Sequence, residues 1–146
     1  CVEELVKKFP DQIIGVKDSS YNLYEKLKIE NFSILPGSEL KLLSSLELGC
    51  SGIITATCNV TASISRKVYD DFYNKKKQIN NQMLCNVRSA FDQFNLISGL
   101  HSFMSDEDID YKNILPPLSL LNNKDKKRLL EDLNKLNFNI GSLKAA

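Results

Sequence analysis

The stretch IIGVKDSS, residues 13–20, decides the fold because it places a lysine at the end of a run of apolar, strand-forming residues. The pattern predicts a strand at about 12–17 that is buried on both faces, as the strands of parallel sheets are. The residues at 18–20 are typical of a helix N-cap. Lys17 would therefore lie where a buried strand opens into a loop, whereas most lysines are exposed to water.

The rest of the chain repeats this order of strand and helix. Short apolar strands that alternate with helices of roughly 10–15 residues are typical of βαβ units, so we predict a parallel sheet covered by helices. Beyond residue 95 the pattern is irregular or short-helical, and Pro116-Pro117 predicts an extended connector before a last amphipathic helix. The expected strands lie at about 12–17, 32–35 and 51–57, and the expected helices at about 2–9, 19–29, 38–48, 60–74, 77 into the nineties, and 122–138.

The composition is that of an ordinary globular protein and limits its partners: 146 residues are 42% hydrophobic and 25% charged, with a net charge of +1. The length suits one domain. A charge this near zero argues against nucleic acid, and no apolar stretch approaches the roughly 20 residues of a membrane span. We expect neither partner and, since the N-terminus does not resemble a signal peptide, a cytoplasmic location. A chain that starts at Cys1 rather than Met is expected to be part of a longer reading frame.

The cysteines and the histidine predict neither disulfides nor a metal site. The four cysteines show no CxxC spacing, and Cys50 and Cys58 flank an apolar strand, so we interpret these two as small core residues in a reducing compartment. The single histidine, His101, belongs to no Cys/His cluster and is expected in a surface or packing role. We predict no cofactor.

The position of Lys17 allows two interpretations. Apolar surroundings would disfavour its ammonium form and lower its pKa, and a neutral amine attacks carbonyl carbons to form a Schiff base. The alternative is a structural ion pair with Asp18 or with another carboxylate. In parallel α/β folds, functional residues gather at the carboxyl ends of strands. Polar residues or glycine follow all three expected strands, at 17–19, 36–39 and 55–59.

Three motifs in this order, GVKDSS, LPGSE and LGCSGIITATCNV, resemble the C-terminal half of the dihydrodipicolinate synthase/N-acetylneuraminate lyase family. The resemblance covers residues 1–75 closely, and ILPPLSLL before the final helix resembles the closing segment of that family. It implies a class I aldolase, independent of metals and cofactors, that forms a Schiff base with pyruvate. It also implies an α/β fold, a TIM (β/α)8 barrel, of which this chain supplies strands 6–8 and their helices and then a C-terminal helical segment.

The resemblance implies roles for residues at the first two strand ends. Lys17 would form the imine with pyruvate. Gly37 would border the active site with its backbone. Ser38 and Glu39 would contact the distal, variable half of the substrate.

At the third strand end, Ile54 would pack against the imine with Thr55 beside it. Asn59 fits the family pattern near the start of the next helix, where a structural role is expected. The chain departs from the family at Tyr21, where members often have glycine, so the loop after the lysine is expected to differ or Tyr21 to point into the pocket.

The expected organisation is a set of C-terminal βα units of a barrel at residues 1–76, with a helical segment at 77–146 packed on them. A closed barrel needs about 200 residues or more, so this chain would need the N-terminal half of the barrel. In the family, that half supplies the proton-shuttling tyrosine and the loop that binds the pyruvate carboxylate, and no residue here matches either. We therefore expect the fragment alone to be inactive, and the whole enzyme to be a homotetramer, as is common in the family.

The leading functional prediction is a Schiff-base pyruvate aldolase or lyase that acts on a 2-keto-3-deoxy sugar acid or a similar hydroxylated 2-keto acid. An alternative is 4-hydroxy-tetrahydrodipicolinate synthase, which condenses pyruvate with aspartate semialdehyde. Another class is a barrel enzyme without an imine that holds phosphate in the loops after strands 7 and 8. The last alternative is a non-catalytic, flavodoxin-like binding domain. The expected partners are small molecules.

Overall fold

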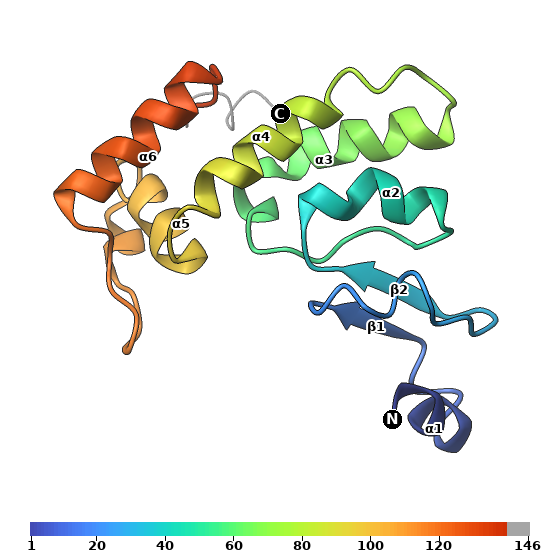
Figure 1. Cartoon of the computed structure of the whole chain (residues 1–146). Coiled ribbons are helices and arrows are strands. Elements are labelled where there is room, and N and C mark those ends of the chain that lie inside the picture. Colours follow the sequence, from blue (N-terminus) through green and yellow to red (C-terminus); the bar gives the residue numbers. More distant parts are fainter. Residues whose placement is uncertain (140–146) are drawn as a thin grey trace.

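The computed structural model describes residues 1–139 as two parallel strands with the N-terminal helix on one side of them and the other helices toward the opposite side (Figure 1). Residues 140–146, the end of the predicted helical segment, lie outside the described part. The elements are α1 (Val2–Lys8), β1 (Gly15–Asp18), β2 (Ser33–Pro36), η1 (Glu39–Lys41), α2 (Leu42–Glu47), α3 (Cys58–Tyr73), α4 (Asn81–Phe91), α5 (Leu96–Met104), η2 (Ile109–Lys112) and α6 (Asn123–Lys135).

Strands β1 and β2 form a parallel ladder that matches the prediction from the apolar runs. Gly15 pairs with Ser33, and Lys17 pairs with Leu35. A Cβ atom on Gly15 would lie 2.9 Å from the carbonyl oxygen of Ser33, which is closer than real Cβ contacts. Glycine at this position therefore allows the two backbones to approach each other.

The third predicted strand is present only as an extended segment beside β2. Ser51 donates a backbone hydrogen bond to Ile34 (3.3 Å) and Ile54 donates one to Pro36 (3.1 Å). Three residues here span two residues of β2, so the ladder is bulged, and Gly52, with φ of +145°, accommodates this. The prediction of a regular strand is wrong, but β2 does lie between β1 and this segment, with all three running parallel.

The helix predicted at 19–29 is absent, and this prediction is wrong. The Asp18 carboxylate accepts hydrogen bonds from the backbone N–H groups of Leu23 (2.9 Å) and Tyr24 (3.0 Å), so it organises a turn where a helix was expected. Tyr21 has a φ of 56°, outside the helical region. The crossover between the two parallel strands is therefore irregular, although such crossovers usually contain a helix.

The remaining helices agree with the sequence pattern over most of their length. The helix expected at 38–48 is divided into η1 and α2 and ends at Gly49, whose φ is +86°, a conformation that favours glycine. The segment after residue 95, expected to be irregular or short-helical, contains the regular helix α5, capped by the Asn95 side chain on the N–H of Ser98. Helices α1, α3, α4 and α6 lie within or close to the expected ranges.

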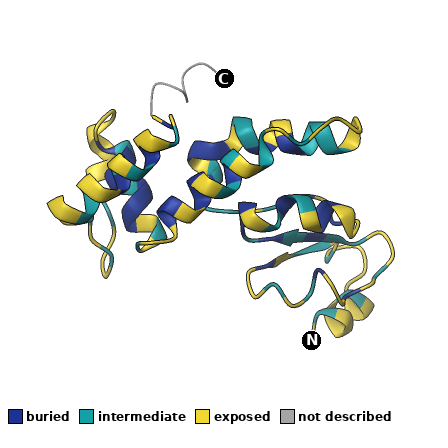
Figure 2. Ribbon diagram, turned by 45° about the horizontal axis from the view of Figure 1, so that its top comes forward, coloured by how far each residue is buried: buried dark blue, intermediate teal, exposed yellow. Residues whose placement is uncertain are grey.

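The main core lies among the helices. Figure 2 shows the buried residues gathered on the facing sides of α4, α5 and α6, where Phe91, Leu129 and Leu133 have 0–1% of their surface exposed. A second cluster joins Leu42 of α2 to Val68 of α3 and to α4. Because α3 packs against both α2 and α4, the predicted boundary between residues 76 and 77 stays a prediction.

Candidate functional site

The carboxyl ends of β1 and β2 bring Lys17 and Gly37 together. The backbone N–H of Gly37 bonds to the carbonyl oxygen of Asp18 (3.0 Å). A Cβ atom placed on Gly37 would lie 3.6 Å from Lys17 Cε and 3.3 Å from Ser19 Oγ. The missing side chain of Gly37 therefore leaves space beside the lysine stem, and its role at an active site stays a prediction.

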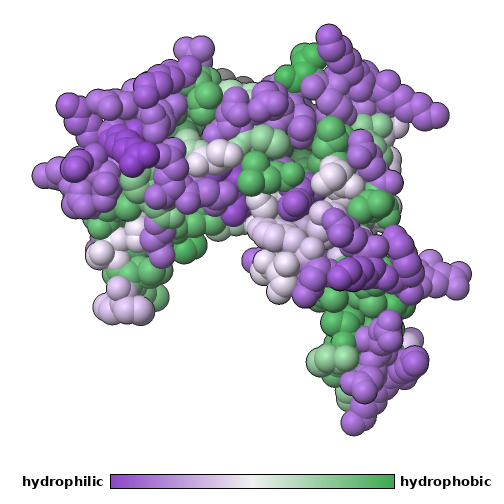
Figure 3. Space-filling model, in the orientation of Figure 1, coloured by the Kyte–Doolittle hydropathy of each residue, from purple (hydrophilic) through white to green (hydrophobic). Residues whose placement is uncertain are grey.

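Both strand ends open on the same side of the molecule. In Figure 1 the arrowheads of β1 and β2 point toward the space between the sheet and the part that contains α5 and η2. The space-filling view shows the molecule hollowed between these two parts, with apolar atoms on the side of the helical part (Figure 3). Ile54, predicted to pack against an imine, is 49% exposed, and Ile14 is 69% exposed. Lys17 is exposed as well, so Lys17 and Ile54 both lie on the accessible surface of this chain.

The environment predicted for Lys17 is not the one found in this chain. The side chain was expected among apolar strands, but it is exposed, because β1 pairs on one edge only, with β2. The alternative ion pair with Asp18 is not formed either. Asp18 is 1% exposed, and its carboxylate binds the backbone of the crossover. Among the ion pairs within residues 1–139, none involves Lys17.

Glu39, predicted to contact substrate, lies inside a buried polar cluster. Its side chain is 0% exposed. Oε1 accepts a hydrogen bond from the Thr61 hydroxyl (2.9 Å), and Oε2 accepts hydrogen bonds from Thr55 Oγ1 (2.9 Å) and from Arg88 Nη1 (2.9 Å). Both oxygens of the carboxylate are therefore engaged within the chain.

Ser38 and Thr55 also have internal partners. Ser38 is 3% exposed, and its Oγ accepts the N–H of Leu40 (3.3 Å), which caps η1. Thr55 Oγ1 lies 3.0 Å from Arg88 Nη1 and 3.1 Å from Thr57 Oγ1. The roles of Ser38, Glu39 and Thr55 in binding substrate stay predictions; in this chain Ser38 caps η1, and Glu39 and Thr55 bond to each other.

Arg88 is the member of this cluster that the sequence reasoning missed. It is 7% exposed and forms ion pairs with Glu39 (2.9 Å) and with Asp92 (2.8 Å). A signal was available, because Leu84, Arg88 and Phe91 share one helical face that otherwise reads as apolar. An arginine on a core-facing stripe indicates a buried partner.

The ionisation of this pair follows from its contacts. Burial opposes the charged form of Glu39, but hydrogen bonds from Thr57, Arg88 and Thr55 outweigh it, so the pKa of the carboxyl lies below its ordinary value. Burial likewise opposes the charge on Arg88, whereas hydrogen bonds to Glu39 and Asp92 raise the pKa of the guanidinium. Both groups are therefore charged near neutral pH.

Asn59, expected near the start of a helix in a structural role, is the second residue of α3. Its side-chain amide donates to the carbonyl oxygen of Ala56 (2.8 Å), which fastens the loop to the helix. The imidazole of His101 contacts the carbonyl oxygen of Tyr111 (2.8 Å), which joins α5 to η2. Both contacts are structural.

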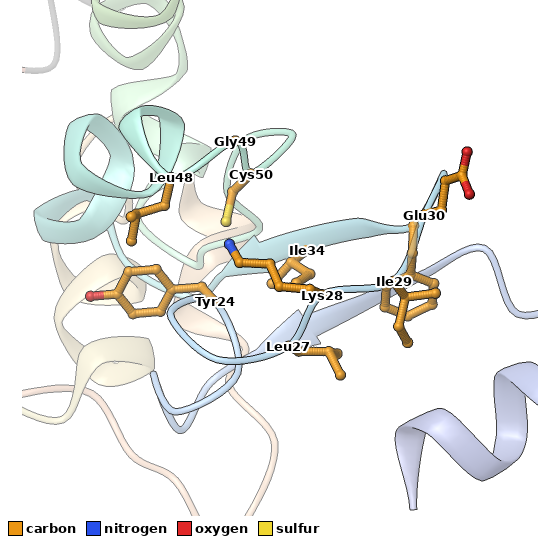
Figure 4. Close-up of a pocket in the computed structure, with 10 residues that line it drawn as sticks. Tyr24, Leu27, Lys28, Ile29, Glu30, Ile34, Leu48, Gly49 and Cys50 are labelled. Atoms are coloured by element: carbon orange, nitrogen blue, oxygen red, sulfur yellow. The ribbon is translucent and has the colours of Figure 1, made fainter.

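A cavity of about 320 Å³ lies at the opposite end of the strands (Figure 4). Phe32 and Ile34, at the beginning of β2, line it together with Gly49, Cys50 and residues of the crossover. Burial raises the pKa of the Cys50 thiol, and the Lys28 ammonium offsets part of this effect. The cavity is thus separate from Lys17 and Gly37.

Two kinds of feature are absent from residues 1–139. No helix there is long and apolar enough to cross a membrane. That part of the chain also holds no group of three or more His, Cys, Asp or Glu side chains that could bind a metal ion.

Comparison with known proteins gives matches over most of the chain. The model of the dihydrodipicolinate synthetase family matches residues 1–136. The 4-hydroxy-tetrahydrodipicolinate synthase of Buchnera aphidicola subsp. Cinara cedri is 28% identical over 137 residues, which are 87% of this chain and 46% of the relative. A protein of the same name from Wigglesworthia glossinidia brevipalpis is 33% identical over 76 residues, 46% of this chain and 26% of the relative.

Solved structures show the same fold. The 4-hydroxy-tetrahydrodipicolinate synthase of Methylacidiphilum fumariolicum SolV superposes with a TM-score of 0.81 at 17% identity, covering 99% of this chain and 52% of that protein. N-acetylneuraminate lyase from Fusobacterium nucleatum gives a TM-score of 0.76 at 19% identity, covering 93% of this chain and 50% of that protein. The chain thus spans about half the length of these relatives.

Proposed function

This chain belongs to the dihydrodipicolinate synthetase family, and from that premise we propose that it supplies the Schiff-base lysine of a pyruvate aldolase or lyase. One juxtaposition carries the proposal: the side chain of Lys17 lies at the carboxyl end of β1, beside the side-chain-free Gly37 at the end of β2. Active sites of (β/α)8 barrels are built from residues at such strand ends. Gly37 gives a small 2-oxo acid access to the lysine.

The chemistry begins with attack of the neutral Lys17 amine on the ketone carbon of pyruvate, and loss of water gives an imine. The protonated imine withdraws electrons, which acidifies the methyl group, and removal of one methyl proton gives an enamine. The enamine carbon then adds to an aldehyde. In the reverse direction, the carbon–carbon bond of a hydroxylated 2-keto acid breaks and pyruvate is released. Ile54, on the segment beside β2, would cover the imine and exclude water.

Lys17 would need further protein around it to act in this way. In this chain its side chain is exposed, so it lacks the apolar surroundings that favour a neutral, nucleophilic amine. Since the chain spans about half of its relatives, we propose that the remaining part of the enzyme covers the free edge of β1 and supplies the groups that bind the carboxylate and move the proton. The homotetramer implied by the family resemblance and the expected cytoplasmic location stay predictions.

The substrate that distinguishes the lyase from the synthase has two candidates. The sequence favoured a 2-keto-3-deoxy sugar acid, because Ser38 and Glu39 would suit hydrogen bonds to its hydroxyls. Those side chains are committed to Leu40 and to the Arg88 cluster, which weakens that argument. Two relatives carry the name 4-hydroxy-tetrahydrodipicolinate synthase, which supports condensation with aspartate semialdehyde as the second candidate.

The test is chemical trapping in the full-length protein. Incubation with pyruvate and borohydride should reduce the imine to a stable adduct on Lys17, which peptide mass spectrometry locates. Lys17→Arg should abolish the adduct, whereas Lys28→Arg, an exposed lysine at the opposite end of the strands, should leave it unchanged. An unmodified wild-type protein would overturn the proposal. Phosphate-dependent thermal stabilisation would then favour the phosphate-binding barrel, and the absence of both responses would favour the flavodoxin-like binding domain.

Two assays of the full-length protein without borohydride then separate the candidates: pyruvate supplied together with aspartate semialdehyde, and a 2-keto-3-deoxy sugar acid supplied alone. Consumption of aspartate semialdehyde would favour the synthase, and release of pyruvate from a 2-keto-3-deoxy sugar acid would favour the lyase. The isolated chain, in which Lys17 is exposed, should form the adduct far more slowly than the full-length protein.

A further inference from the structure

A single guanidinium joins the loop after β2 to the extended segment beside β2. Arg88 lies on α4, far along the chain from these two segments, and its Nη1 contacts residues of both. It is 2.9 Å from Glu39 Oε2, in the loop after β2, and 3.0 Å from Thr55 Oγ1, on the segment beside β2. The carbonyl oxygen of Gly37 and Thr57 Oγ1 lie slightly farther away, at 3.4 Å each.

The hydrogen atoms of this cluster can be assigned by counting. Nη1 of a guanidinium carries two hydrogens, so the two short contacts, to Glu39 and Thr55, take them. The Thr55 hydroxyl accepts from Arg88 and donates its own hydrogen to Glu39 Oε2 (2.9 Å). Each of the three groups thus bonds to the other two, which fixes the loop after β2 against the third segment.

The positive charge of Arg88 is neutralised within the chain, without a ligand. Nε of Arg88 bonds to Asp92 (2.8 Å), so the guanidinium lies between two carboxylates. Glu39 is 0% exposed and Arg88 is 7% exposed. A substrate anion would therefore find little positive charge here, which argues that Arg88 works through the groups it holds.

We propose that Arg88 is a positioning residue for the reaction of Lys17. Its bonds to Glu39 and Thr55 set the separation between the loop that carries Gly37 and the segment that carries Ile54, and Gly37 borders the Lys17 side chain. The catalytic part of this inference rests on the proposed function. Its structural part, that Arg88 tethers two loops, stands independently.

Without Arg88, the buried Glu39 would lose its ion-pair partner. An unpaired carboxylate must take up a proton or move toward water, and either change releases the loop that begins at Gly37. Displacement of a positioned group by about 1 Å can slow a reaction by roughly 100-fold. Imine formation is therefore expected to slow by roughly 10- to 100-fold when the tether is cut.

The experiment compares variants of the full-length protein in three measurements: urea unfolding, hydrogen exchange in the peptides that cover 36–41 and 53–57, and the rate of the borohydride-trapped pyruvate adduct. The variants are Arg88→Met, Arg88→Lys and the double change Arg88→Met with Glu39→Gln. The control is Arg66→Met, which removes an arginine that pairs with Asp70 on the exposed face of α3.

The expected pattern separates positioning from stability. Arg88→Met should lower stability, speed exchange in both peptides and slow adduct formation, whereas Arg66→Met should do none of these. Arg88→Lys should recover part of the adduct rate, since its ammonium can still pair with Glu39. The double variant should recover stability, because no buried charge is left unpaired, yet keep fast exchange and a low adduct rate.

Two results would overturn the inference. One is recovery of the adduct rate together with stability in the double variant, which would make Arg88 merely structural. The other is unchanged exchange at 36–41 and 53–57 in Arg88→Met. If the wild type forms no pyruvate adduct, the proposed function fails, and the exchange measurement alone then decides whether Arg88 tethers the two loops.

Discussion

Two glycines of this chain should respond in opposite directions to the same substitution, and the structure supplies the reason. Gly15 lies on β1, and a Cβ atom there would meet the carbonyl oxygen of Ser33 at 2.9 Å and Ser33 Cβ at 3.1 Å. The first contact is with backbone, so rotation of a side chain cannot relieve it. Gly15→Ala must therefore push β1 away from β2.

The size of the effect follows from two opposing terms. Forcing a methyl group into a closely packed site costs about 1–3 kcal/mol. Alanine also reduces the conformational freedom of the unfolded chain, which raises the free energy of unfolding by about 0.4–1 kcal/mol at most. Gly15→Ala should thus lower the free energy of unfolding by about 1–2 kcal/mol.

Gly99, in α5, provides the matched case. A Cβ atom there would lie 3.4 Å from Phe91 Cδ1 and 3.7 Å from Leu129 Cδ2, which are ordinary van der Waals distances. Alanine is favoured over glycine inside a helix by about 1 kcal/mol. Gly99→Ala should therefore stabilise the protein by about 0.5–1 kcal/mol.

Urea unfolding followed by far-UV circular dichroism measures both free energies under one set of conditions. Both variants replace glycine with alanine, so opposite signs of the change in the free energy of unfolding must come from the space available around each position. A neutral or stabilising Gly15→Ala would show that β1 and β2 are not held as closely as described. Destabilisation by Gly99→Ala would show that the Phe91 contact is already at its limit.

Three further outcomes are expected. Because Glu39 has a lowered pKa in the folded protein, it stabilises the fold above its unfolded pKa of about 4.3 and loses this effect as the pH falls through the folded value. Urea midpoints of Glu39→Gln should consequently decline less than those of wild type between about pH 5 and pH 3, and parallel curves would refute this. Gly37→Ala places a methyl group 3.6 Å from Lys17 Cε, so it should slow pyruvate trapping while changing the urea midpoint little, and an unchanged trapping rate would contradict the site geometry. Burial raises the pKa of the Cys50 thiol and shields it from reagents, so iodoacetamide at pH 7.5 should label the exposed Cys1 at least about tenfold faster than it labels Cys50. Equal labelling rates for the two cysteines would be inconsistent with the described core.

Features that depend on nearby residues could be predicted from the sequence. The apolar run before Lys17 predicted β1, and Gly49 marked the end of α2, because both signals act over a few residues. The proximity of Lys17 and Gly37 also followed, since the carboxyl ends of neighbouring parallel strands meet at one edge.

Features that depend on distant contacts could not be predicted in the same way. The helix expected at 19–29 is replaced by a turn that the Asp18 carboxylate holds, and nothing in its spacing distinguishes that carboxylate from a helix cap. Helix α5 contains Gly99 and serines, which are weak helix formers, and it is stabilised by packing against α6. The pair of Arg88 and Glu39 joins positions 49 residues apart, beyond the reach of any periodic pattern.

The irregular crossover between β1 and β2 has a consequence for how this part of the chain holds together. A helix in that place would cover the strands and would be held by its own backbone hydrogen bonds. In residues 19–32, by contrast, two backbone N–H groups are bonded to one buried carboxylate, that of Asp18. Local opening should accordingly begin here, and a single opening event would uncover both the strand that carries Lys17 and the cavity that Lys28 and Cys50 line. The two ends of the sheet, chemically unrelated, would then share one weak point.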